Sequence, residues 1–179
     1  IRRRFPAGLA YFLVLACGLW SAALRASAQS DSQSKAARIA RIAQVTNWPA
    51  RKLGTSKPLV IGIIGAPSME ELLQEQCRRL NGGNVIVRPL SALEEIRGCH
   101  VLFVSASEQA QLSRILRQTR GEPILTIGES ENFMREGGIV TLTMISGTAQ
   151  FTCDISNMRR ARLEIDPEAL ALANPPPQR

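Results

Sequence analysis

Between residues 59 and 144 the chain alternates short apolar runs with amphipathic segments, and this alternation restricts the folds open to it. The strand-like runs are Leu59–Gly65, Val85–Val87, His100–Ser105, Ile124–Ile127 and Ile139–Met144. Helical spacing of apolar residues occupies Met69–Leu80, Ala92–Arg97 and Glu108–Arg120. Strands that alternate with helices form βαβ units, whose right-handed crossovers place helices on both faces of a mainly parallel sheet. We therefore expect a three-layer α/β domain of the Rossmann or flavodoxin-like type.

Beyond Gly137 the pattern changes from alternating elements to two adjacent strands. Ile139–Met144 and Ala149–Ile155 are separated by Ser146-Gly147, a dipeptide typical of a hairpin turn. We therefore expect the edge of the sheet to be an antiparallel hairpin. The remaining segments are a short helix at Asn157–Arg162, a β-like stretch at Leu163–Ile165, a last helix at Pro167–Ala173 and a disordered tail over residues 174–179.

The first 28 residues have no acidic side chain and show the three parts of a secretory signal. Arg2–Arg4 form the positive region, Phe5–Leu24 the apolar region, and Ala26–Ala28 the small-residue cleavage pattern. We expect cleavage before Gln29 and export to the bacterial periplasm. The apolar run is also about the length that spans a bilayer, so an uncleaved anchor is the alternative.

The net charge argues against a nucleic-acid-binding protein. The chain has 22 basic and 15 acidic side chains, a formal net charge of +7. Cleavage would remove four of the basic ones (Arg2, Arg3, Arg4 and Arg25) and lower the charge to +3. That is an ordinary surface, and the few aromatic residues cannot build a base-stacking platform.

Groups suited to catalysis or metal binding are few. His100 is the only histidine, and no nucleophile motif or set of clustered metal ligands accompanies it. Glu70-Glu71 and Glu94-Glu95 are neighbours on helices, so the side chains of each pair diverge. The turn at Gly62–Ser68 lacks the third glycine of a dinucleotide loop and the lysine of a P-loop. We expect no enzymatic activity, no metal and no cofactor.

Three cysteines remain after the expected cleavage: Cys77, Cys99 and Cys153. In an oxidising compartment two of them are expected to pair and one to remain a free thiol. Cys77 near the end of a crossover helix and Cys99 at the start of a strand fall at the same end of the sheet. A bridge between these two is therefore possible, with two buried thiols as the alternative, and Cys153 on the edge strand is the free thiol.

The apolar residues of Lys35–Asn47 have the spacing of an amphipathic helix. We expect Ser34 to cap the start of this helix, and residues 29–34 to form a polar tether before it. If the protein binds a partner, we expect the apolar stripes of this helix and of the Leu163–Ala173 terminus to be used. The side chains concerned are Ile39, Ile42, Val45, Trp48, Leu163, Ile165 and Leu170. Packing of these side chains on the core is the alternative.

Seven short sequence segments, spread in order over residues 35–173, resemble the YfiR-like family of small periplasmic regulators. They are Lys35-Ala36 leading to Asn47-Trp48-Pro49, Leu59–Gly65, Cys99–Phe103, Leu125–Gly128, Gly137–Val140, Phe151–Ile155, and Leu163–Ile165 leading to Leu170–Ala173. The resemblance implies a non-catalytic, generally dimeric protein. Such a protein binds the periplasmic sensory domain of an inner-membrane diguanylate cyclase and holds it inactive, which lowers cyclic di-GMP and disfavours biofilm growth.

The resemblance also implies that the redox state of the cysteines affects such repressors, and here the chain departs from the family. Some members carry a cysteine in the first strand, about where this chain has Gly62, which can pair with the cysteine of the Cys99-His100 motif. Cys77 is the substitute that we expect in this chain.

A small-ligand-binding component of a transport or receptor system is the alternative function. Doubly wound sheets commonly bind ligands at the carboxyl ends of their strands. Small residues flank that edge here, at Gly65–Ser68, Ser105–Ser107 and Gly128–Ser130, and would leave room for a ligand.

Overall fold

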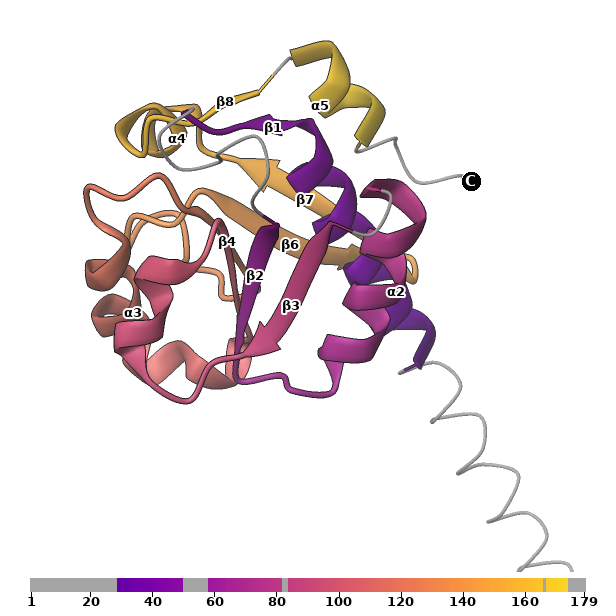
Figure 1. Ribbon diagram of the computed structural model, residues 1–179, viewed down its shortest axis with the longest axis horizontal. Coiled ribbons are helices and arrows are strands. Elements are labelled where there is room, and N and C mark those ends of the chain that lie inside the picture. Colours follow the sequence, from indigo (N-terminus) through magenta and orange to yellow (C-terminus); the bar gives the residue numbers. More distant parts are fainter. Residues whose placement is uncertain (1–28, 50–57, 82–83, 166, 174–179) are drawn as a thin grey trace, which may run out of the picture.

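The computed structural model describes residues 29–49, 58–81, 84–165 and 167–173 (Figure 1). The expected signal and tail lie outside these ranges. Residues 29–45 are helical, and the elements that follow are β1 (Thr46–Asn47), β2 (Leu59–Ile64), α2 (Met69–Asn81), β3 (Val85–Pro89), the 3-10 helix η1 (Leu93–Gly98), β4 (Val101–Val104), the 3-10 helix η2 (Ala106–Gln111), α3 (Leu112–Thr119), β5 (Leu125–Gly128), β6 (Val140–Ile145), β7 (Thr148–Cys153), α4 (Ile155–Arg160), β8 (Glu164–Ile165) and α5 (Pro167–Ala173).

Six strands form one sheet in the order β3-β2-β4-β5-β6-β7. Neighbouring strands from β3 to β6 are parallel, and β7 is antiparallel to β6. The hairpin between β6 and β7 turns at Ser146 and Gly147, whose φ angles of 50° and 74° are both in the left-handed region that a two-residue type I′ turn requires. The prediction of a mainly parallel α/β sheet with an antiparallel edge is confirmed.

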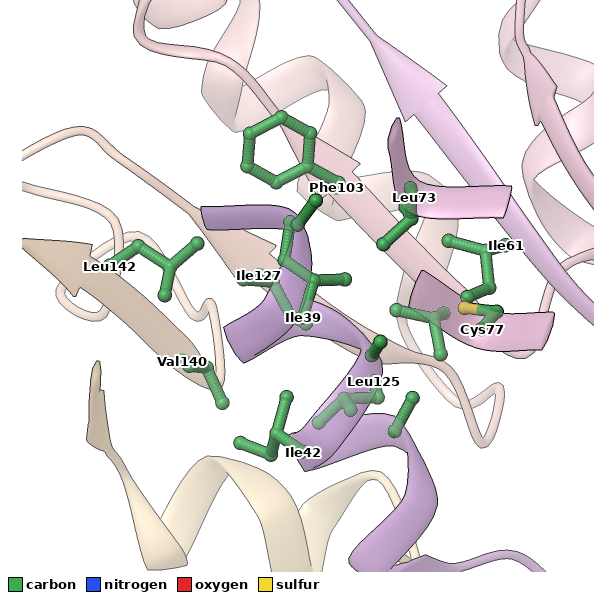
Figure 2. Packing of buried hydrophobic residues seen from close by; sticks show 14 of the residues in the cluster. Ile39, Ile42, Ile61, Leu73, Cys77, Phe103, Leu125, Ile127, Val140 and Leu142 are labelled. Atoms are coloured by element: carbon green, nitrogen blue, oxygen red, sulfur yellow. The ribbon is translucent and has the colours of Figure 1, made fainter. Parts of the chain in front are cut away.

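The sheet buries two faces, because successive side chains on a strand point to opposite sides. We call them the α2 face and the α3 face after the helices that cover them. On β2, Ile61 and Ile63 belong to the cluster beneath the 29–45 helix and α2, whereas Ile64 packs in the cluster beneath η1 and α3. Figure 2 shows the α2 face, where Ile39 and Ile42 lie among side chains of the strands.

A second, two-stranded sheet joins the two ends of the described chain. β1 pairs with β8 in antiparallel register, Thr46 opposite Ile165 and Asn47 opposite Glu164. Figure 1 shows these two strands side by side, with α5 following β8. The pairing brings together the Lys35–Trp48 and Leu163–Ala173 segments, which the sequence analysis selected separately as partner-binding surfaces.

The prediction of a polar tether before Lys35 is wrong in the structure, where residues 29–34 are helical. Ser34 does not cap the helix, because its Oγ accepts a hydrogen bond of 2.8 Å from the Ala149 N–H of β7. One turn further on, the Arg38 Nε donates to the Ala149 carbonyl at 2.7 Å. The polar side chains of this helix therefore satisfy the outward backbone groups of an edge strand.

The strand at the other edge of the six-stranded sheet, β3, is covered in the same way by α2. The Gln74 amide donates from Nε2 to the Val85 carbonyl at 2.9 Å, and its Oε1 accepts from the Val87 N–H at 3.0 Å. Two residues on, Pro89 has no N–H to offer. Since unpaired edge groups are what a further strand would pair with, both edges are blunted at these positions.

Candidate partner interface

The turn after α4 places a charged residue in a conformation that glycine usually adopts. The Leu163 N–H donates to the Met158 carbonyl at 3.1 Å and the Arg162 N–H to the Arg159 carbonyl at 2.9 Å, the pair of bonds that defines a Schellman cap. Arg162 is the left-handed residue, with a φ of 58°. A side chain costs about 1–2 kcal/mol there relative to glycine, and strain of this kind gathers at functional positions.

Trp48, just after β1, is anchored to the main sheet. Its Nε1 donates to the His100 carbonyl at 3.2 Å, and its ring meets the imidazole edge to face with centroids 6.3 Å apart. The buried His100 accepts a bond of 3.0 Å at Nδ1 from the Val60 N–H. This bond ties the imidazole to β2, so the His100 side chain links β2 to the residue that precedes β4.

The β1–β8 sheet and the residues at the end of α4 line an open cavity of about 500 Å³, which we call the β1–β8 cavity. The lining residues are Asn47, Trp48, Pro49, Arg159, Arg162, Leu163 and Glu164. An indole and an apolar floor thus lie beside two guanidinium groups and one carboxylate. Aromatic and arginine side chains around a recess are the composition of interface hot spots.

The structure divides the predicted partner-binding residues into two groups. Ile39 and Ile42 are 0% exposed, so they pack in the core and offer a partner no surface, because a helix must bury its apolar stripe against the sheet it covers. For these two the alternative of core packing holds. Leu163 is 1% exposed and packs in the same core, but it also lines the β1–β8 cavity. The partly buried side chains are Val45, Trp48, Ile165 and Leu170.

Five lining residues of the β1–β8 cavity were not among the predicted partner-binding residues: Asn47, Pro49, Arg159, Arg162 and Glu164. The run Arg159-Arg160-Ala161-Arg162 is the signal that was available, because basic side chains cluster there. Nothing in the sequence places this run beside Trp48, since that contact depends on the pairing of β1 with β8.

The expected bridge between Cys77 and Cys99 is not formed, and the described chain holds no disulfide among Cys77, Cys99 and Cys153. Cys77 packs in the cluster of the α2 face. The Cys99 Sγ lies on the other side of the sheet, only 2.7 Å from where a Cβ on Gly62 would be. Both cysteines are at the same end of the sheet, as predicted, but the sheet separates their thiols.

Burial makes two of the thiols poor nucleophiles. It raises the pKa of Cys77 to about 11, and burial together with the neighbouring Asp154 carboxylate raises the pKa of Cys153 to about 11. The thiolate is the reactive form, so both cysteines are largely protonated and slow to react at neutral pH.

At the carboxyl ends of the strands, side chains of the protein lie close to two of the glycines that were expected to leave room for a ligand. A Cβ on Gly65 would lie 2.6 Å from the Ser107 and Glu108 side chains, and Ser107 donates to the Gly65 carbonyl. A Cβ on Gly128 would lie 2.2 Å from the ring of the buried Phe133. Gly65 and Gly128 therefore make room for Ser107 and Phe133.

No helix in the described ranges is both long enough and apolar enough to cross a membrane.

A search of curated proteins found no match. Among solved structures, a conserved domain protein from Vibrio cholerae O1 biovar eltor strain N16961 aligns at 10% identity with a TM-score of 0.46. The alignment covers 63% of this chain and 52% of that one, so this chain spans about half the length of the other.

The comparison with protein families gives a clear result. The family model described as YfiR/HmsC-like matches residues 32–174, which is most of the chain and includes the 29–45 helix from its second turn, the whole six-stranded sheet and the β1–β8 sheet. The chain therefore belongs to the YfiR/HmsC-like family.

Proposed function

We propose that the protein is a periplasmic regulator that binds the sensory domain of an inner-membrane diguanylate cyclase and holds the enzyme inactive, so that cyclic di-GMP stays low. Membership of the YfiR/HmsC-like family is the observation that carries this proposal, because that family consists of non-catalytic periplasmic regulators of cyclic di-GMP signalling. Export through a cleaved signal and a homodimeric state are parts of the same proposal.

The β1–β8 cavity is the surface that we assign to the partner. It offers an aromatic wall from Trp48 and a positive rim from the exposed Arg159. A segment of the cyclase with an apolar side chain beside an acidic one would complement it. Strand addition is a poor alternative, since Ser34, Arg38 and Gln74 already satisfy outward groups of β7 and β3.

The first experiment measures binding. The purified protein is immobilised and exposed to detergent-solubilised inner membranes, and we expect it to retain a protein with a diguanylate cyclase domain. The affinity for that partner is then measured for Arg159→Ala, which removes an exposed charge from the cavity rim. Loss of one charged contact should weaken binding about tenfold or more, at an unchanged melting temperature.

Arg114→Ala is the matched control, because Arg114 is an equally exposed arginine on α3 and does not line the β1–β8 cavity. It should bind as the wild type does. Failure to retain any cyclase would reject the proposed function. Retention of a cyclase with equal affinity for Arg159→Ala would reject only the surface.

A further inference from the structure

A second cavity, of about 570 Å³, opens on the α3 face where β5 begins. The end of α3, the turn before β6 and α4 form its walls, and we call it the β5 cavity. Its floor is apolar, with the buried side chains of Leu116 and Ile124, which belong to the cluster of the α3 face. A recess of this volume accommodates a small molecule.

Two buried polar side chains line the β5 cavity, Thr126 at 2% and Asn157 at 7% exposure. The Asn157 Nδ2 donates to the Met134 and Gly138 carbonyls at 3.1 and 2.7 Å, and its Oδ1 accepts from Arg160 at 3.0 Å. These bonds hold the turn against α4. The Thr126 Oγ accepts from the Ile139 N–H at 3.0 Å, so its own hydroxyl hydrogen points away from that bond and can donate.

Three arginines from three different elements also line the cavity: Arg120, Arg135 and Arg160. The two lining carboxylates are already engaged. Glu136 accepts a bond of 2.6 Å from the Ser113 hydroxyl, and the Asp154 Oδ1 accepts one of 2.9 Å from the Asn157 N–H. The lining therefore has one positive charge in excess.

Arg120 is the arginine best placed to take a ligand. It follows the last residue of α3, its side chain is exposed, and within the described part of the chain its guanidinium makes no hydrogen bond or ion pair. The next residue is held in place, because the Arg162 guanidinium donates to the Gly121 carbonyl. The backbone that carries Arg120 is thus tied to the end of α4.

We propose that the β5 cavity binds a small carboxylate with an apolar body, such as an aromatic acid. The carboxylate pairs with the Arg120 guanidinium, which matches its two oxygens with two parallel N–H donors. The apolar body lies on the floor of Leu116 and Ile124. The site does not depend on the proposed partner, because the β5 and β1–β8 cavities share no lining residue.

Isothermal titration of the purified protein with benzoate tests the site, with benzamide as the neutral molecule of the same shape and inorganic phosphate as the anion without an apolar body. We expect saturable binding of benzoate. Benzamide and phosphate should each bind at least about tenfold more weakly, because each lacks one of the two features that the cavity recognises.

Arg120→Ala should weaken benzoate binding about tenfold or more at an unchanged melting temperature. Arg117→Ala is the control, since Arg117 is exposed on α3 itself and does not line the cavity. Arg120→Gln keeps most of the side chain without its charge, and should lose benzoate binding as Arg120→Ala does.

Three results would overturn the proposal: no saturable binding of benzoate at millimolar concentration, equal affinity for benzoate and benzamide, or wild-type affinity in both Arg120 variants. Phosphate binding as tight as benzoate binding would also overturn it, because it would leave the apolar floor without a role.

Discussion

The two faces of the six-stranded sheet are covered to different degrees. On the α2 face, the 29–45 helix and α2 lie over the strands, and the C-terminal residues Met158 and Leu163 complete the cluster. The α3 face has a smaller cluster among the described residues, under η1 and α3, and Phe133 fills the notch between Gly128 and Gly138. Beyond Phe133 that face opens into the β5 cavity.

The difference shows how one small domain can separate stability from recognition. The α2 face is closed by long helices whose apolar stripes are used in packing, and the binding groups that we propose lie at its end, around Trp48. The α3 face has a recess between the end of α3, the turn before β6 and the short α4. A closed face should respond to mutation mainly through stability, and an open one mainly through ligand binding.

The largest expected effect comes from truncation on the closed face. Ile39→Ala should lower the free energy of unfolding by about 3–5 kcal/mol, because the fully buried side chain leaves a void that the cluster cannot fill. Leu116→Ala should cost about 2 kcal/mol, since Leu116 lines the β5 cavity and its neighbours can relax into that space. Urea denaturation measures both, with the exposed Arg41→Ala as a control expected to change less than about 0.5 kcal/mol. Equal losses at the two positions would contradict the difference between the faces.

Gly62→Ala tests where the Cys99 thiol lies. The added methyl group would meet the Cys99 Sγ and the Leu90 Cδ1 at 2.7 Å, so we expect a loss of about 1–3 kcal/mol from overpacking. Combining it with Cys99→Ala removes one of the two clashing atoms. The double variant should therefore lose less than the sum of the two single variants in a denaturation cycle. Strict additivity would show that the thiol lies elsewhere.

Arg162→Gly should raise stability, by about 0.5–1 kcal/mol, because glycine adopts the left-handed conformation without strain. Thermal unfolding measures the change, and Arg160→Gly serves as the comparison. Arg160 is the last residue of α4 and donates to the Asn157 side chain, so glycine should destabilise there. A destabilised Arg162→Gly protein would mean that its bond to Gly121 outweighs the backbone strain.

The buried thiol of Cys77 should contribute to stability at neutral pH and lose that contribution in alkali. Its folded-state pKa of about 11 lies above the unfolded value of about 9, so the folded state holds the proton more tightly. The contribution of the protonated thiol to the free energy of unfolding is fully present below pH 9 and is lost as the pH rises towards about 11. The free energies of unfolding of the wild type and Cys77→Ala, measured by denaturation at each pH, should therefore converge over this range. A constant difference between the two proteins would show that burial does not raise the pKa of the thiol.

Much of the fold could be predicted from the sequence because local patterns determine it. Runs such as Leu59–Gly65 and the helix at Met69–Leu80 match β2 and α2 closely, since hydrophobic periodicity decides both. The segment Glu108–Arg120, expected as one helix, begins as the 3-10 helix η2 before α3. Such a change of helix type leaves little trace in apolar spacing.

The candidate sites were less predictable because they depend on contacts between distant segments. β1 and β8 have two residues each, too few for a strand pattern, and only their pairing brings Trp48 beside Arg159. The sequence placed Cys77 and Cys99 at one end of the sheet but could not show that they lie on opposite faces. The β5 cavity likewise arises from how α4 packs, which no local spacing encodes.

The central claim is that the chain restrains a cyclase through the β1–β8 cavity. The most direct test is the cyclic di-GMP content of a deletion strain that is complemented with the wild type, Arg159→Ala or Arg114→Ala at equal expression. We predict that deletion raises the nucleotide, that the wild type and Arg114→Ala restore the low level, and that Arg159→Ala does not. An unchanged cyclic di-GMP level on deletion, or full restoration by Arg159→Ala, would contradict the claim.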